Sequence, residues 1–397
     1  MTTASSRASS SRLALAALLA VLPACVDHEP ALTGTTSLRV EITTPTSLGT
    51  DDAPLCPDPS VVCAERQVNV AVTALDQDGK PDPTVNGELD IYAHYLGTLT
   101  PDQPKGFALA TVTMKDGLAT GTVDLATAYG TTLVWAEDVR RDGASYATGV
   151  SPALRYRDPF LADVQDSSGI SPLAWMERSP LEGKQVRVSR SQFSQQGQLV
   201  VTGVYAQGYT VSDVKVADHS TPDFGHAFIF TFGRPRAQGN REIKVGHVVN
   251  KVSGGVSEFN GYTEFNFPQT ELVDGDPDLA RVPAPRVLDP AWLALPADPN
   301  GMINLEKLES GLVQVNGGKV CDTMGDTSFT KFKQWRLDMG AGCKAGTFSV
   351  SAVPGFDPVA HKDDTIKSVV GTLKAVSIGS FHVWIVQPRG EADIQIN

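Results

Sequence analysis

Five basic residues within eighteen positions form the densest group of ligand-binding side chains in this 397-residue sequence. Guanidinium and ammonium groups bind phosphates and carboxylates, and aromatic rings beside them stack on bases. These cations, with three tyrosines from nearby predicted strands, are therefore the candidate ligand-binding residues. The simpler alternative is a solvated basic loop whose tyrosines belong to the protein core. The candidates are Arg234, Arg236, Arg241, Lys244, Lys251, Tyr205, Tyr209 and Tyr262.

Sequence signatures of catalysis are absent. There is no Gly-x-Ser-x-Gly, His-Glu-x-x-His, P-loop or Gly-x-Gly-x-x-Gly motif. His226 and His247 lie near predicted strands of one region, but such histidines more often occupy a surface or a core than share a metal ion. We expect no catalytic residue, no metal and no cofactor, and hence no enzyme. A hydrolase with a site built from scattered carboxylates stays the alternative.

An apolar leader precedes Cys25. Arg7 and Arg12 are followed by ten uncharged residues, 13–22, a run too short to span a bilayer and typical of a signal-peptide core. Residues 22–25, Leu-Pro-Ala-Cys, resemble the lipobox of bacterial lipoproteins. The resemblance implies cleavage before Cys25 and acylation of that residue, and Val26 in place of Asp favours the outer membrane. The alternative is an ordinary secretory peptide with Cys25 as a plain thiol.

The other four cysteines form two sequence-local pairs. An exported protein reaches a compartment in which disulfides form, so pairing within each neighbourhood is the simplest of the three connectivities. No Cys-x-x-Cys occurs and no histidine lies at ligand spacing, which argues against zinc. The predicted disulfide residues are Cys56 with Cys63 and Cys321 with Cys343.

Charge is unevenly distributed along the chain. Residues 25–182 hold 10 Lys and Arg against 23 Asp and Glu, whereas residues 183–397 hold 21 against 22. The acidic first part argues against binding of nucleic acid or an anionic membrane surface there. The second part is neutral and leaves that question open.

Residues 37–157 read as a β-sandwich. Alternating apolar residues at 38–42 and 68–74 predict strands, and Asp116-Gly117 predicts a tight hairpin. The Asp-Gln-Asp-Gly turn at 76–79, the Ala-Tyr-Gly-Thr segment at 128–131 and the strand with Trp135 resemble bacterial Ig-like domains. Residues 76–79 also match the opening of a calcium loop. Gly87 stands where that loop needs Glu, so a plain turn is preferred.

The second half reads as two further β units. Strand-Gly-strand patterns and the segment Glu-Phe-Asn-Gly-Tyr-Thr-Glu-Phe at 258–265 resemble OB-like domains of secreted bacterial proteins, some of them attached to extracellular nucleases. A Val-x-Gly, turn and aromatic strand ending at Pro recurs at Pro268 and Pro388, which indicates a degenerate repeat. A nuclease would need a separate catalytic domain, and no segment is left for one.

The sequence therefore predicts an all-β protein, an Ig-like β-sandwich followed by two OB-like β-barrel units. Its expected function is that of a non-enzymatic, lipid-anchored outer-membrane protein that presents its β-domains for binding or structural interaction, with an unknown protein or polysaccharide as the partner. The alternative is an oligonucleotide- or polysaccharide-binding lipoprotein acting through the first OB-like domain. The expected parts are a signal peptide 1–24, a tether 25–36, the sandwich 37–157, a linker 158–183, an OB-like domain 184–275, a Pro-rich connector 276–300 and a second OB-like domain 301–397.

Overall fold

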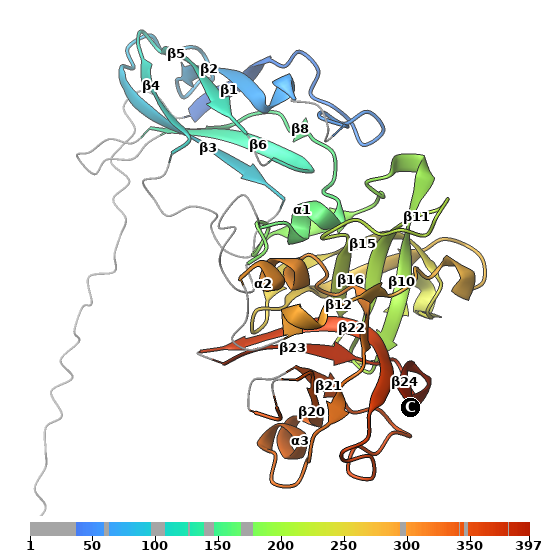
Figure 1. Ribbon diagram of the computed structural model, residues 1–397. Coiled ribbons are helices and arrows are strands. Elements are labelled where there is room, and N and C mark those ends of the chain that lie inside the picture. The colour runs from blue at the N-terminus through green and yellow to red at the C-terminus, as the bar shows by residue number, and fades with distance from the viewer. Residues whose placement is uncertain are drawn as a thin grey trace, which may run out of the picture.

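The chain folds as three β-rich units in series. The computed structural model describes residues 37–58, 63–96, 108–125, 128–138, 147–167, 178–293, 299–340, 342–344, 348–379 and 381–397. A sandwich, a barrel and a C-terminal unit follow one another from blue through green to red (Figure 1). Cys25, its leader and Trp175 lie outside the described residues.

The sandwich consists of two sheets over one core. One sheet has the order β1-β2-β5, and the other has the order β4-β3-β6-β7 with β8 beside β6. The alternation predicted at 68–74 is confirmed, because Val68, Val70 and Val72 are all at most 1% exposed and lie in the core with Ile91 and Val134 of the other sheet. The strands are β1 (Ser37–Thr44), β2 (Gln67–Leu75), β3 (Gly87–Tyr95), β4 (Ala110–Met114), β5 (Leu118–Asp124), β6 (Thr131–Asp138), β7 (Thr148–Val150) and β8 (Leu154–Arg155).

The Asp116-Gly117 turn joins the two sheets of the sandwich. Both residues have positive φ, as a tight turn requires, but the flanking chain pairs only at Lys115 and Leu118. Beyond that bridge β4 pairs with β3, whereas β5 pairs with β2. The predicted tight turn is confirmed, since Lys115 and Leu118 exchange backbone hydrogen bonds, but beyond it each strand joins a different sheet.

Both predicted disulfides are confirmed. Cys56 pairs with Cys63, with 5.5 Å between their Cα atoms, and Cys321 pairs with Cys343, with 5.7 Å. The first closes a loop at the edge of the sandwich. The second ties the end of β19 to the chain after β20 in the C-terminal unit.

The middle unit is a barrel closed by five strands. Their order is β10-β11-β12-β16-β15, and β15 pairs back with β10, while β9 joins the outer side of β15. Only β12 and β16 run parallel. The strands are β9 (Gln185–Val188), β10 (Gly197–Tyr205), β11 (Gly208–Lys215), β12 (His226–Phe230), β15 (Val248–Glu258) and β16 (Thr263–Leu272), with the short β13 (Arg236–Ala237) and β14 (Arg241–Glu242) between β12 and β15.

The segment predicted as a linker, 158–183, belongs in part to this barrel. Its helix α1 (Leu161–Gln165) places Leu161 and Val164 in the barrel core, where Leu181 joins them. The Gln165 amide donates to the His226 carbonyl at 3.0 Å. Burial of these three apolar side chains joins the sandwich to the barrel.

The C-terminal unit repeats the strand order of the barrel. Its path is β18-β22-β23-β21-β20-β19, with β21 and β23 parallel, β17 beside β18 and β24 beside β22. Only Gly317 and Gly318 separate β18 from β19, so the sheet curls until its ends meet. A Cβ on Gly318 would lie 2.7 Å from Leu337 Cγ. The elements are β17 (Arg286–Val287), α2 (Pro299–Glu306), β18 (Leu312–Asn316), β19 (Lys319–Val320), α3 (Thr327–Phe332), β20 (Gln334–Asp338), β21 (Ser349–Ser351), β22 (Ile366–Ile378), β23 (Phe381–Gln387) and β24 (Ile394–Ile396).

The recurring proline has different roles in the two units. Pro388 follows the end of β23, as predicted, but β16 continues past Pro268 to Leu272. The ladder with β15 shifts register between the Gly255–Asn266 and Ser253–Gln269 pairs, which leaves Phe267 and Pro268 in a bulge. A bulge tolerates a residue without an N–H, so the prediction that this strand ends at Pro268 is wrong.

The C-terminal unit packs on the outer face of β11 and β12. Phe228 of the barrel and Tyr262 of its β15–β16 loop belong to the same core as Leu305 and Leu373 of the C-terminal unit. Hydrogen bonds cross this interface as well. Tyr205 Oη lies 2.6 Å from Thr372 Oγ1 and donates to the Gln387 carbonyl at 3.1 Å, and Ser377 N donates to the Asn260 carbonyl at 2.6 Å.

Buried carboxyl groups lie within the same interface. Glu309, 2% exposed, accepts a hydrogen bond from Thr263 N at 3.1 Å, and Glu258 accepts one from Thr263 Oγ1 at 2.8 Å. Burial, then the neighbouring Glu306 and Glu258, raise the pKa of Glu309 well above its usual value. Burial also raises the pKa of Glu258 to about 7. The cationic group near Glu309 is Lys374, whose pKa burial lowers.

We predict that stability falls as pH rises through neutrality. In the folded protein Glu258 keeps a proton that an unfolded glutamate, with a pKa of 4.5, has lost. The stabilisation from this bound proton is complete below pH 4.5 and disappears as pH rises through about 7. Glu258→Gln should flatten the pH dependence and stabilise the protein at pH 8 by about 1.4 kcal/mol per pKa unit of the shift. Urea unfolding followed by tryptophan fluorescence measures this, since Trp335 and Trp384 lie in the C-terminal unit. Exposed Glu41→Gln is the control, and equal pH profiles for both variants would contradict the prediction.

Candidate functional site

The cations of the predicted basic cluster are engaged by neighbouring carboxylates and carbonyls. Arg234 and Lys244 both pair with Glu242, whose pKa is lowered first of all by Arg234. Lys251 lies 2.9 Å from Glu271. Arg236 donates to the Asn240 carbonyl at 3.1 Å, and Arg241 donates to the carbonyls of Val273 and Gly275. Each cation thus has a partner within the barrel.

The three tyrosines lie away from these cations. Tyr209 is 0% exposed and hydrogen-bonds Thr270 within the barrel, and Tyr262 is 2% exposed beneath the C-terminal unit. Tyr205 is partly buried in the same interface. The candidate cations and tyrosines therefore do not share one exposed face, and the burial of Tyr209 and Tyr262 agrees with the simpler alternative of a solvated basic loop whose tyrosines belong to the core.

Two exposed aromatic residues that the sequence analysis missed lie closer to the arginines. Phe232 and Phe267 are 56% and 75% exposed, with ring centroids 5.1 Å apart, and both have positive φ. Phe232 lies two residues before Arg234. The signals in the sequence were Pro268 after Phe267 and Gly233 after Phe232. Hydrophobic periodicity alone does not show that these two rings are exposed.

His226 and His247 have separate hydrogen-bond partners. His226 Nδ1 lies 2.8 Å from Ser212 Oγ, and His247 Nδ1 accepts from Lys244 N at 3.0 Å. Burial lowers the pKa of His226 to about 3, so its imidazole is neutral. Ser212 and His226 have the spacing of a nucleophile and its base, but they are 0% and 2% exposed. Substrate has no access to that pair in this arrangement.

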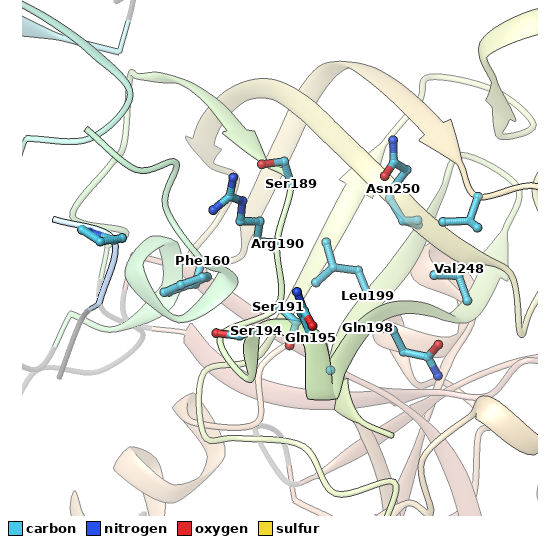
Figure 2. A pocket seen from close by; sticks show the side chains of 14 residues that line it. Phe160, Ser189, Arg190, Ser191, Ser194, Gln195, Gln198, Leu199, Val248 and Asn250 are labelled. Carbon is cyan, nitrogen blue, oxygen red and sulfur yellow. The ribbon is translucent and has the colours of Figure 1, made fainter. Parts of the chain in front are cut away.

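A pocket of about 550 Å³ lies where the sandwich meets the barrel of the middle unit, called the first barrel below (Figure 2). Its walls are the segment 189–195 between β9 and β10, the starts of β10 and β15, and Phe160 just before α1. This volume is within the range of small-molecule sites. The lining residues are Pro57, Phe160, Ser189, Arg190, Ser191, Ser194, Gln195, Gly197, Gln198, Leu199, Val248, Val249, Asn250 and Val273.

Asp213, on β11, holds the wall 189–195 in place. Its carboxylate accepts from Ser191 Oγ at 2.5 Å and from Gln192 N at 2.7 Å, while Ser191 Oγ accepts from Phe193 N at 3.0 Å. Burial raises the pKa of Asp213 to about 6, and these two bonds to its carboxylate oppose the rise. Gly197 is needed here, since a Cβ at that position would overlap Ser191 Oγ.

Polar groups of the pocket remain available to a ligand. Within the described part of the chain, the side chains of Ser194, Gln195 and Gln198 make no hydrogen bond. Each amide offers two donors and one acceptor oxygen. Buried Leu199 and Val249 form an apolar floor between them. The arrangement suits a ligand with many hydroxyl groups and an apolar face.

A smaller hollow adjoins the pocket at Ser189 and Arg190. There the buried Asp158 accepts from Arg187 Nε at 2.6 Å, from Ser189 Oγ at 2.9 Å and from Arg155 at 3.1 Å. Burial raises the pKa of Asp158, and the Ser189 hydroxyl and Arg155 oppose this. These bonds connect β8 of the sandwich to β9 of the barrel, so the junction itself shapes the pocket.

No aspartate, glutamate, histidine or cysteine is among the described residues that line the pocket. General acid–base catalysis, nucleophilic attack by cysteine and metal coordination all need such groups. The lining offers amide, hydroxyl and guanidinium groups instead.

We predict that Asp213→Ala loosens the wall 189–195. Loss of the carboxylate leaves the Ser191 hydroxyl and the Gln192 N–H without their acceptor, which costs about 1–3 kcal/mol of local protection. Hydrogen exchange measured by mass spectrometry should show faster exchange in this segment. Asp218→Ala is the matched control, since Asp218 is exposed beyond the end of β11. Unchanged protection of 189–195 in the Asp213 variant would contradict the assignment.

No helix among the described residues is long and apolar enough to cross a membrane. Comparison with protein-family models, curated proteins and solved structures finds no match. The chemistry of the site therefore rests on the chain's own residues.

Proposed function

We propose that this chain is a non-enzymatic, lipid-anchored protein of the outer membrane that binds a hydroxyl-rich ligand, a polysaccharide, in the pocket between the sandwich and the first barrel. The observation that carries the proposal is the lining of that pocket. It presents amides and hydroxyls over an apolar floor and no group for acid–base chemistry. Glycoside hydrolysis, by contrast, uses a pair of carboxyl groups flanking the scissile bond.

Strand topology supports an OB-like assignment for both C-terminal units and an Ig-like one for the sandwich. In the barrel, strands 1 to 5 are β10, β11, β12, β15 and β16. In the C-terminal unit, β18 and β19 together count as strand 1, and β20 to β23 are strands 2 to 5. Neighbouring strands follow the order 1-2-3-5-4-1 in both units, and strands 3 and 5 are parallel. OB folds are five-stranded Greek-key barrels. The two sheets of the first unit, packed over one core, suit an Ig-like sandwich.

The covered face of the first barrel explains why the ligand site is elsewhere. OB folds bind ligands on the face of strands 2 and 3 and on the adjoining loops. In this barrel that face is β11 and β12, where the C-terminal unit covers Phe228 and Tyr262. The pocket lies instead beside β10 and β15, strands 1 and 4, at the junction with the sandwich.

The anchor part of the proposal is tested at Cys25. Mature protein extracted from membranes should begin at this residue and carry the mass of its acyl chains, whose burial contributes about 0.8 kcal/mol per CH₂. Cys25→Ser should abolish this mass increase and shift the protein to the aqueous phase of a detergent partition. A wild-type protein that is water-soluble with its leader intact would contradict the anchor.

The binding part is tested with Gln195→Ala/Gln198→Ala. Retardation of the full mature chain in native gels containing soluble polysaccharides should be lost in this variant, with affinity reduced about tenfold or more for the two hydrogen-bonding groups. Gln67→Ala/Gln269→Ala, at two exposed positions, is the matched control.

Two results would overturn the binding part. One is the release of shortened saccharides during incubation with the protein, which would make it a hydrolase. The other is binding of single-stranded DNA alone, weakening steeply with salt and lost in an Arg234/Arg236/Arg241 triple Ala variant, which would move the site to the basic loop.

A further inference from the structure

Resting on the proposed function, we infer that the saccharide bound in this pocket carries an anionic substituent that pairs with Arg190, while its hydroxyl groups bind the neighbouring amides. The ligand class is thus an acidic oligosaccharide, with a carboxylate or a phosphate as the charged group.

The pocket has a positive neighbourhood in an acidic protein. The chain carries a formal charge of −12. The linings of the pocket and of the adjoining hollow nevertheless contain four arginines and two aspartates: Arg155, Arg157, Arg187 and Arg190 against Asp51 and Asp158. Local charge complementarity therefore favours an anionic ligand here.

Arg190 is the arginine of this group with the weakest pairing inside the protein, although burial raises the pKa of Asp158 and the Arg190 charge helps to oppose this. Arg157 pairs with Asp163 at 2.6 Å, and Arg155 and Arg187 pair with Asp158. The Arg190 guanidinium makes one long bond, 3.5 Å, to the Asp51 carbonyl, and among the described residues no carboxylate lies within ion-pair distance of it. A ligand anion would supply the missing charge partner in bidentate geometry.

Both chain neighbours of Arg190 are fixed. The Ser189 hydroxyl donates to Asp158 at 2.9 Å, and the Ser191 hydroxyl donates to Asp213 at 2.5 Å. Arg190 itself is exposed. Its backbone is therefore held in position before a ligand arrives, which reduces the entropy lost on binding.

The rest of the pocket suits the neutral part of a saccharide. Figure 2 shows Arg190 to the left and Asn250 to the right of Leu199, with Gln195 and Gln198 below Leu199 in this view. An amide can donate to one hydroxyl and accept from another. The apolar floor suits the C–H face of a sugar ring.

Nucleic acid fits this lining less well. Single strands bind to grooves with several cations and exposed aromatic platforms. The aromatic residue of the pocket, Phe160, is 8% exposed, and the Arg157 guanidinium lies 4.3 Å from its ring centroid. Its ring is therefore unavailable for stacking on a base.

Calorimetry on the full mature chain tests the inference with three probes: hexagalacturonate, maltohexaose and a phosphorylated maltohexaose. At 50 mM salt we expect the charged probe that matches the natural substituent to bind about tenfold more tightly than maltohexaose. Arg190→Gln should remove this advantage and leave maltohexaose binding unchanged. Arg39→Gln, an exposed arginine on β1 next to Glu41, is the matched control and should change neither.

Each result decides between the two proposals. Tighter binding of the uronate or of the phosphate ester, dependent on Arg190, supports the inference and identifies the charged group. Equal binding of all three probes, unaffected by Arg190→Gln, overturns the inference and leaves the proposed function standing. Binding of none of them overturns both.

Discussion

Burial of the outer face of β11 and β12 under the C-terminal unit is the interaction on which the rest of the structure depends. Phe228 and Tyr262 leave the surface there and join the apolar core that contains Leu305 and Leu373. At roughly 25 cal/mol per Å² of apolar surface, two such rings contribute several kcal/mol to this docking. The face is therefore unavailable to a ligand while the two units are docked, and any ligand of the first barrel has to bind elsewhere.

Docking also determines where polar groups are buried. Every residue of β11 from Gly208 to Val214 is buried, because one side of the strand faces the barrel core and the other faces the C-terminal unit. Thr202 Oγ1 lies 3.0 Å from Thr210 Oγ1, so these hydroxyls satisfy one another in the interface. Asp213, near the exposed end of the same strand, instead fixes the pocket wall through Ser191.

Sequence periodicity and cysteine spacing predicted the local features of this fold. The alternation around Val70 identified a half-buried strand, and sequence-local cysteines indicated the two disulfides, since both depend on neighbours within a few residues. Tyr209 and Tyr262, two of the candidate ligand-binding residues, are buried. A period of two shows that a strand has two faces, but it does not show that a second unit will cover the outer one. The pocket was missed because its wall depends on a contact between residues distant in sequence. Asp213 reaches Ser191 only because β10 pairs with β11.

Buried carboxylates at both junctions are better understood as positioning groups than as sources of stability. Burial raises the pKa of Asp158 at the sandwich junction and of Glu258 at the barrel interface, which means that ionising them in the folded protein costs free energy. An apolar side chain at either place would avoid that cost, as it does for many buried ion pairs. It would not, however, accept bonds from Arg155, Arg187 and Ser189 together. Asp158 makes those three bonds from one carboxylate, and they hold the sandwich and the start of the pocket wall in one relative position. The binding geometry of the pocket thus depends on a carboxylate whose ionised form costs free energy to bury.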